Sequence, residues 1–417
     1  MRSTRLIRTA WFLLIALALS AAPVLAQSKK EEEEAKKKAA AANSIDAQTG
    51  KKLQAAIDAL NATPPQYTTA KGSLDSIKQD GLSPYECSRV QQLYAAIYNS
   101  QEKFNDARGA LNKAITCGGL NEVELDQVSF NIAQLYLAEE KWKEGAAALE
   151  SWIAKTPKPN SNAYYMLAVA YYQMGDERRA LPPAEKAIAM AEKPQPSWLQ
   201  LVLALYLKNE QYAKAEPMVR KLVAAEPSKK ANWVQLSAVL GAQEKYDDAL
   251  IALNLAYHMG LLTDATDLTR LADLMAFNNL PYRCASMLTK EQAKVGNSGK
   301  TFEKISNCWV AAREWDKAVA PLKSAANASR SGDLWARLGE VQVQREDWNG
   351  AIDALRKALE AGNARDPGNA QILLGMSYYN LKKPQEARQW FQRAMGTRHA
   401  KQAEGWIRAI DTESGKS

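Results

Sequence analysis

The apolar positions from residue 46 onward follow a helical period and recur in a longer unit of two helices. Helix A carries an apolar or aromatic residue, then a small residue, and an aromatic residue three positions later. After a short turn, helix B opens with an aromatic residue and has a small residue three positions on, which we call the reference residue of the unit. Ten reference residues recur about every 34 residues, at Ala70, Ala107, Gly145, Ala180, Ala215, Ala249, Ala285, Ala318, Ala351 and Ala387.

Residues at fixed distances before the reference residues share a size or a ring. Aromatic residues stand three positions before, at Tyr67, Phe104, Trp142, Tyr212, Tyr246, Tyr282, Trp315 and Trp348. Small residues stand twelve positions before, at Ala95, Ala133, Ala168, Ser237, Ser306, Gly339 and Gly375. We expect the aromatic ring to pack under the turn between the two helices, and the small residues to let the helices approach closely.

This combination of positions resembles the tetratricopeptide repeat over roughly residues 48–398. The resemblance implies an all-α fold, an α-solenoid of about ten tetratricopeptide-like helix pairs. The unit at about residues 266–298 is poorer, because Leu280-Pro281 stands where a turn glycine is expected; it is either a bend in the solenoid or a repeat that has drifted. We therefore assign residues 46–398 to the solenoid and residues 399–417 to a capping helix and tail.

The first 26 residues differ from the repeats. Their arginines form a basic start (Arg2, Arg5 and Arg8), a short apolar run covers residues 11–19, and a signal-peptidase site ends at Ala26. This pattern predicts a signal peptide over residues 1–26, cleaved after Ala26, and hence a periplasmic protein without a membrane span after cleavage. The alternative is an uncleaved N-terminal anchor. Residues 27–45 are blocks of acids and bases without an apolar stripe, which indicates a charged linker or, alternatively, a docking tail.

Four cysteines in an exported chain suggest disulfides. Cys87 precedes helix A of one unit and Cys117 follows helix B of the same unit, so antiparallel helices bring them together. Cys284 begins a helix B and Cys308 lies near the end of the next helix A. We predict the pairs Cys87–Cys117 and Cys284–Cys308; the alternative is four buried free thiols.

The sequence offers little for catalysis. It contains two histidines, His258 and His399, and neither has a second His or Cys at metal-ligand spacing. No glycine-rich phosphate loop occurs, and the net charge of +8 is spread among charges of both signs, without the basic stripe that nucleic-acid binding requires. We predict no enzyme activity, no cofactor, no metal and no nucleic-acid partner.

A partner protein is expected to bind along the A helices, which line the concave groove of a tetratricopeptide superhelix. The groove positions lie 18, 15, 11, 8 and 7 residues before each reference residue. Aromatic and amide side chains suited to holding a peptide occupy them at Phe130, Gln134, Asn162, Tyr165, Tyr172, Gln173 and Gln200. Alternatively, Tyr165 and Tyr172 pack against neighbouring repeats. The Lys and Asn pairs that clamp a C-terminal carboxylate in chaperone-binding repeats are absent from the groove positions of these units.

Two segments, residues 163–211 and 232–292, resemble the exported tetratricopeptide protein that accompanies some TonB–ExbB–ExbD systems of proteobacteria. The resemblance implies a non-enzymatic periplasmic scaffold for an energy-transduction and uptake system, with the TonB/ExbB/ExbD inner-membrane complex as its partner. The alternative function is a periplasmic adaptor for envelope assembly, in secretion, pilus or cell-wall machinery.

Overall fold

The computed structural model describes residues 44–413. The predicted signal peptide lies outside these residues, as does all but the end of the predicted linker. The chain divides into two compact units, Met1–Asn209 and Glu210–Ser417, and each is described by itself. The described residues form helices and no strand, and none of these helices has the length and apolar character to cross a membrane.

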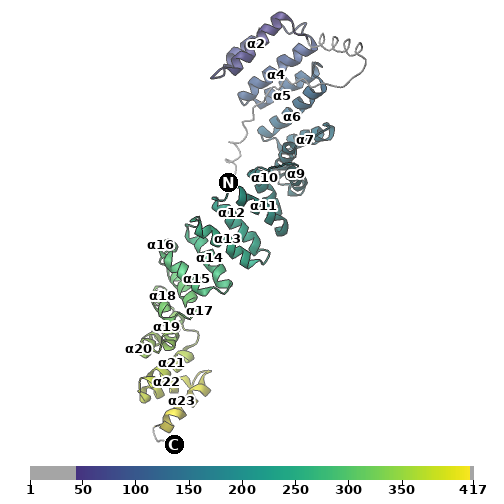
Figure 1. The fold of residues 1–417 in the computed structure, drawn as a ribbon. Coiled ribbons are helices and arrows are strands. Elements are labelled where there is room, and N and C mark those ends of the chain that lie inside the picture. The colour runs from purple at the N-terminus through teal and green to yellow at the C-terminus, as the bar shows by residue number, and fades with distance from the viewer. Residues whose placement is uncertain (1–43, 414–417) are drawn as a thin grey trace. The chain divides into compact units, whose positions relative to one another are not determined.

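In the first unit, successive helices form antiparallel pairs (Figure 1). These are α2 (Ala47–Asn61) with α3 (Tyr67–Asp75), α4 (Pro84–Ser100) with α5 (Phe104–Thr116), α6 (Glu122–Ala138) with α7 (Trp142–Lys155), and α8 (Ser161–Gln173) with α9 (Glu177–Met190); α10 (Pro196–Lys208) follows.

The second unit begins with α11 (Tyr212–Ala225) and continues in the same manner. Its pairs are α12 (Lys230–Gly241) with α13 (Tyr246–His258), α14 (Ala265–Phe277) with α15 (Pro281–Lys290), α17 (Gly299–Ala311) with α18 (Trp315–Ser329), α19 (Gly332–Gln344) with α20 (Trp348–Glu360), and α21 (Pro367–Asn380) with α22 (Pro384–Ala394). The short α16 (Gln292–Val295) follows α15, and α23 (Ala400–Glu413) is the last helix among the described residues. The predicted all-α solenoid of repeated helix pairs is confirmed.

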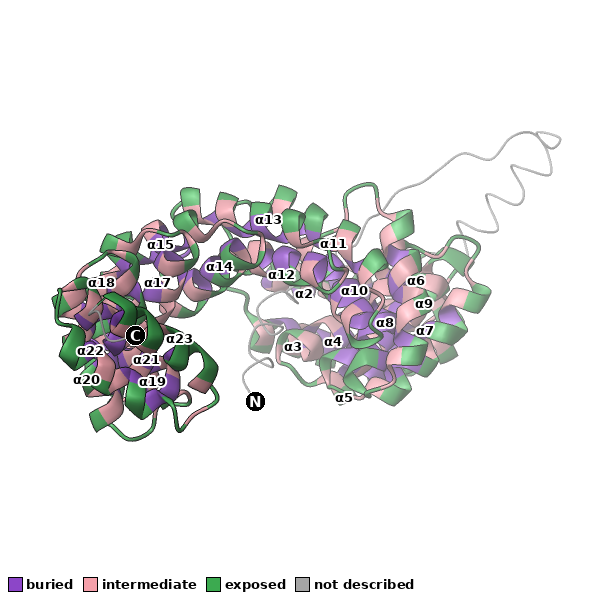
Figure 2. Ribbon diagram, turned by 90° about the horizontal axis from the view of Figure 1, so that it is seen from below, coloured by how far each residue is buried: buried purple, intermediate pink, exposed green. Residues whose placement is uncertain are grey.

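Close packing within a pair depends on the small residues that define the repeat. All ten reference residues are buried, and nine of them are alanines with no exposed surface. A Cβ atom added to Gly339 would lie 2.4 Å from Cγ of Leu355 on the partner helix, and one added to Gly375 would lie 2.4 Å from Cε1 of Phe391. The glycines at these positions are therefore required by the distance between helices. Figure 2 shows the result, with buried residues where helices meet and exposed residues on the outer sides of helices such as α13 and α20.

The turns between helix A and helix B share one backbone conformation. From α4 to α22, each such turn holds a residue with φ between 54° and 74°, in the left-handed region: Glu102, Glu140, Gly175, Glu210, Glu244, Asn279, Arg313, Glu346 and Lys382. In most of these turns the following N–H donates to a carbonyl five residues earlier, as from Lys245 to Leu240 at 3.0 Å. This pattern closes the C-terminus of helix A.

The poorer unit at residues 266–298 has a turn of the same kind. Asn279 takes the left-handed conformation, and the Leu280 N–H donates to the Met275 carbonyl at 2.8 Å. A glycine is absent from most of the other turns as well, so its absence here does not set this unit apart. One apolar core runs through the unit, from Leu250 on α13 to Ala358 on α20. What differs is helix B, which is interrupted into α15 and α16, while the core continues through the unit.

Both predicted cysteine pairs lie at disulfide distance. The Cα atoms of Cys87 and Cys117 are 5.8 Å apart, and those of Cys284 and Cys308 are 5.9 Å apart. The first pair joins the start of α4 to the end of α5, within one repeat. The second joins α15 to α17, across neighbouring repeats.

The last helix, α23, covers the apolar face of the final repeat. Ala403 and Ile410 are buried, and the Trp406 ring stacks on Phe391 of α22 with ring centres 5.6 Å apart. Arg398 and His399, just before α23, are held to the start of α21. The carboxylate of Asp366, the N-cap residue of α21, accepts a hydrogen bond from Arg398 and lies 3.0 Å from Nε2 of His399. This position suits a helix that ends a solenoid.

Candidate partner-binding groove

The predicted groove residues lie on three A helices of the first unit. Phe130 and Gln134 are on α6, Asn162, Tyr165, Tyr172 and Gln173 are on α8, and Gln200 is on α10. They divide into side chains that support the packing and side chains that face solvent.

Phe130 belongs to the packing. Only 8% of its surface is exposed, and its ring lies 4.6 Å from the ring of Trp152 on α7. The Trp152 indole N–H in turn donates to the Asp126 carbonyl at 3.0 Å, which fixes the pair of rings. The expectation that Phe130 offers its ring to a partner is therefore corrected, since α7 already covers that ring.

Tyr165 also packs against a neighbouring repeat. Its ring stacks on Trp198 of α10, with centres 4.9 Å apart and planes inclined by 15°. Burial raises the pKa of the Tyr165 hydroxyl. For this residue the alternative of packing between repeats describes what the structure shows.

The two amides near Tyr165 contact a single methionine. The side-chain N–H groups of Gln134 and Asn162 point to Sδ of Met166, at 3.9 and 3.4 Å. Sulfur is a weak acceptor, so these contacts leave both amides available for a stronger acceptor.

Tyr172, Gln173 and Gln200 remain open. Tyr172 is 39% exposed, and both glutamines are exposed. Within the first unit, these three side chains are the predicted residues best placed to meet a partner.

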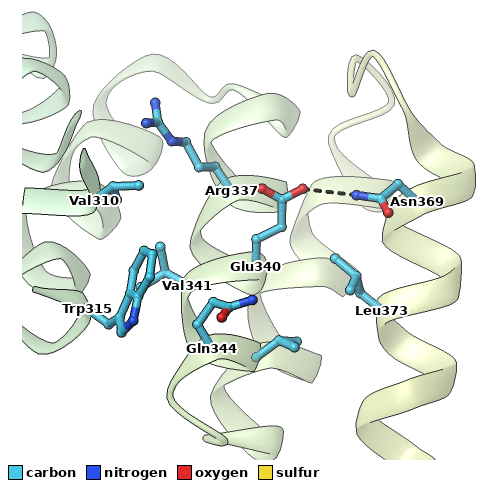
Figure 3. Close-up of a pocket in the computed structure, with 9 residues that line it drawn as sticks. Val310, Trp315, Arg337, Glu340, Val341, Gln344, Asn369 and Leu373 are labelled. Atoms are coloured by element: carbon cyan, nitrogen blue, oxygen red, sulfur yellow. Dashed lines mark hydrogen bonds between the residues drawn. The ribbon is translucent and has the colours of Figure 1, made fainter. Parts of the chain in front are cut away.

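The second unit contains a pocket that the choice of aromatic and amide residues missed. It has a volume of about 360 Å³ and lies where α17, the start of α18, α19 and α21 meet. Val310 and Trp315 lie on one side with Val341 beside Trp315, Gln344 lies below, and Leu373 lies on the opposite side (Figure 3). We call this hollow the α17–α21 pocket.

Counting from the reference residues places part of this pocket's lining at groove positions. Val310 lies 8 positions before Ala318, Glu340 lies 11 before Ala351, and Asn369 lies 18 before Ala387, all of which are groove positions. Asn369 follows from the same count in the sequence. Valine and glutamate at the other positions do not stand out by residue type.

Polar groups line the upper rim of the α17–α21 pocket. The Asn369 side-chain N–H donates to Glu340 Oε1 at 2.9 Å, while the Arg337 guanidinium donates to Asn307 Oδ1. Figure 3 shows the Glu340 carboxylate directed toward Asn369 and the Arg337 guanidinium extending away from it. Partial desolvation at the pocket raises the pKa of Glu340, although the nearby Arg337 charge lowers it.

Metal ligands do not gather in the described part of the chain, where no group of three or more His, Cys, Asp or Glu side chains could hold an ion. His399 is engaged with Asp366 near the last helix.

Comparison with known proteins supports the repeat assignment. The tetratricopeptide repeat family matches residues 130–195, 205–260 and 336–403. The comparison with curated proteins gave no match.

Several solved structures are similar to parts of the chain. A tetratricopeptide repeat protein from Parabacteroides merdae is 16% identical, with 58% of this chain and 93% of that chain covered and a TM-score of 0.36. YrrB, described as a tetratricopeptide repeat protein with an unusual peptide-binding site, is 15% identical over 44% of this chain and 88% of its own, with a TM-score of 0.35. MamA from Desulfovibrio magneticus is 21% identical over 40% of this chain and 93% of its own, with a TM-score of 0.32.

The family match covers helix pairs in both units, and it agrees with the repeating small and aromatic positions. Residues 130–195, 205–260 and 336–403 are thus similar to tetratricopeptide repeats.

Proposed function

We propose that this protein is a non-enzymatic scaffold of the periplasm that holds partner proteins on its A helices and serves a TonB-type energy-transduction system. Tetratricopeptide repeats form surfaces for protein–protein interaction. The observation that best supports a binding role is the α17–α21 pocket, where groove positions of three successive A helices meet.

The periplasmic location draws support from the cysteines. All four lie in pairs at disulfide distance, and disulfides persist in oxidising compartments. The basic and apolar start of the sequence is typical of a signal peptide cleaved after Ala26.

The location is tested by alkylating the protein in intact cells and in cell fractions, without a reductant. We expect the mature protein in the periplasmic fraction, with all four thiols blocked until a reductant is added. Free thiols in a cytoplasmic fraction would contradict the proposal.

The TonB role draws support from the sequence resemblance of residues 163–211 and 232–292. It is tested by affinity purification of the tagged full chain from crosslinked envelopes. We expect a TonB, ExbB or ExbD homologue among the captured proteins. Capture of secretion, pilus or cell-wall components in their place would favour the alternative of an envelope-assembly adaptor.

A further inference from the structure

Glu340 places a carboxylate in the α17–α21 pocket without a cation bound to it. Among the described residues its hydrogen-bond partner is the neutral Asn369 amide, and no ion pair includes it. Other carboxylates of this unit are paired: Asp316 with Arg345, Asp333 with Arg365, and Asp366 with Arg398. The carboxylate remains accessible from the groove, so a cation from outside can reach it.

The nearest internal cation is occupied elsewhere. Arg337 stands one helical turn before Glu340 on α19, where an ion pair could form. Its guanidinium instead binds Asn307 on α17. The two charges therefore mark opposite sides of the pocket rim (Figure 3).

Below the carboxylate the pocket is apolar and aromatic. Trp315 and Val310 form one wall and Leu373 forms the other. Such a surface suits the aliphatic stem of a long basic side chain, whose charged head then reaches the polar rim. A guanidinium can also stack on an indole ring while it hydrogen-bonds to a carboxylate.

We propose that the α17–α21 pocket binds a basic side chain, with arginine preferred over lysine, from a partner segment that has aliphatic residues beside it. Glu340 binds the charged head, and Trp315 and Leu373 contact the stem. The volume of about 360 Å³ lies at the small end for ligand pockets, which suits one long side chain better than a cofactor. The inference rests on the proposed scaffold function and adds the chemistry by which a partner is recognised.

The test is a selection of phage-displayed random peptides on the full chain. Three proteins are compared: the wild type, Glu340→Gln and Glu360→Gln. The Glu340→Gln side chain keeps an oxygen that can accept the Asn369 hydrogen bond, so the pocket keeps its shape. Glu360→Gln is the matched control, because Glu360 is an exposed carboxylate at the end of α20, outside the pocket. Thermal unfolding of all three confirms that they are folded.

We expect the wild type and Glu360→Gln to select peptides with arginine beside leucine, isoleucine or valine. Glu340→Gln should lose this selection, and the best peptide should bind it about tenfold more weakly, because the charge-assisted hydrogen bond is removed. Replacing the arginine of that peptide by glutamine should have a similar effect on the wild type and little further effect on Glu340→Gln.

Other outcomes overturn the inference. Selection of acidic peptides would assign recognition to Arg337, and equal selection by the wild type and Glu340→Gln would exclude Glu340. A lack of any enriched peptide would also contradict it. The envelope purification does not involve these peptides, so failure of the inference and failure of the proposed function are separate results.

Discussion

At the scale of single residues, the left-handed turns between helix A and helix B are held mostly by residues other than glycine. Glutamate alone occupies five of them, and Gly175 is the one glycine among the nine turns described. A side chain in this conformation costs about 1–2 kcal/mol relative to glycine, because Cβ approaches the following carbonyl oxygen. The hydrogen bonds of the turn and the packing of both helices must offset that cost.

Replacing such a residue by glycine should therefore stabilise the protein. We expect Glu244→Gly to raise the free energy of unfolding by about 0.5–1 kcal/mol, since the relief of strain exceeds the greater freedom of glycine in the unfolded chain. Denaturant unfolding followed by circular dichroism measures the change.

The reverse change is the control. Gly175→Ala should lower the free energy of unfolding by about 1 kcal/mol, although a Cβ at Gly175 meets no other atom within 4 Å. If both substitutions left stability unchanged, the turns would not be strained.

The close approach of α19 and α20 leads to a second prediction. Gly339→Ala should destabilise the protein by about 1–3 kcal/mol, because the new methyl group would overlap the Leu355 side chain. Gly241→Ala is its control, since a Cβ there meets nothing within 4 Å. Equal melting temperatures for the two variants would contradict the role given to Gly339.

At the scale of helices, the two tyrosines of α8 separate packing from binding. Tyr165→Ala removes a ring stacked on Trp198 and should lower the free energy of unfolding by about 2 kcal/mol. Tyr172→Ala removes an exposed ring and should change it by less than about 0.5 kcal/mol, while reducing the capture of partners by the first unit. Urea unfolding and crosslinked purification of each variant measure the two effects. A large loss of stability in Tyr172→Ala would place that ring in the core.

Helix pairing could be predicted from the sequence because it depends on local spacing. Small residues at fixed distances decide how closely two successive helices approach, and all ten reference residues are buried as the pattern requires. The cysteine pairs followed from the same antiparallel geometry.

How deeply each residue at a groove position is buried could not be predicted from the spacing of small residues. The spacing assigns Phe130 and Tyr165 to the groove side of helix A, yet Trp152 and Trp198 cover them from other helices. How far one helix covers another depends on the volumes of side chains distant in sequence. For the same reason the α17–α21 pocket, with Val310 and Glu340 at groove positions, could not be recognised by residue type.

At the scale of the whole molecule, paired carboxylates predict a loss of stability in acid. Burial would raise the pKa of Asp366, but hydrogen bonds from Arg398, the Asn369 N–H and His399 lower it to about 2. The hydrogen bond from Lys245 outweighs burial at Glu216 and, with those from Arg220 and Gln243, lowers its pKa to about 2. Both groups are ionised in the folded state at pH values where the unfolded chain already binds protons.

Their stabilising contribution is therefore complete above about pH 5 and is lost as the pH falls from about 5 to about 2. Asp366→Asn should make the free energy of unfolding less dependent on pH over this range. Asparagine can still accept the N-cap hydrogen bond from Asn369, so α21 should keep its first turn. Urea unfolding at a series of pH values measures the slope, and Glu360→Gln controls for the loss of one carboxylate. Equal slopes for the wild type and Asp366→Asn would contradict the prediction.

Disulfide bonds at the two cysteine pairs would also limit how far a pulling force can extend the chain. A partner that pulls on one end of a row of repeats can unfold them one after another, since each repeat contacts only its neighbours. The bonds close loops with sequence separations of 30 and 24 residues. At about 3.4 Å per extended residue, the closed loops would keep about 100 Å and about 80 Å of chain from being extended. A repeat protein under tension would thus stop lengthening at these two points, and the helices that the bonds join would stay close enough to re-form when the tension is released.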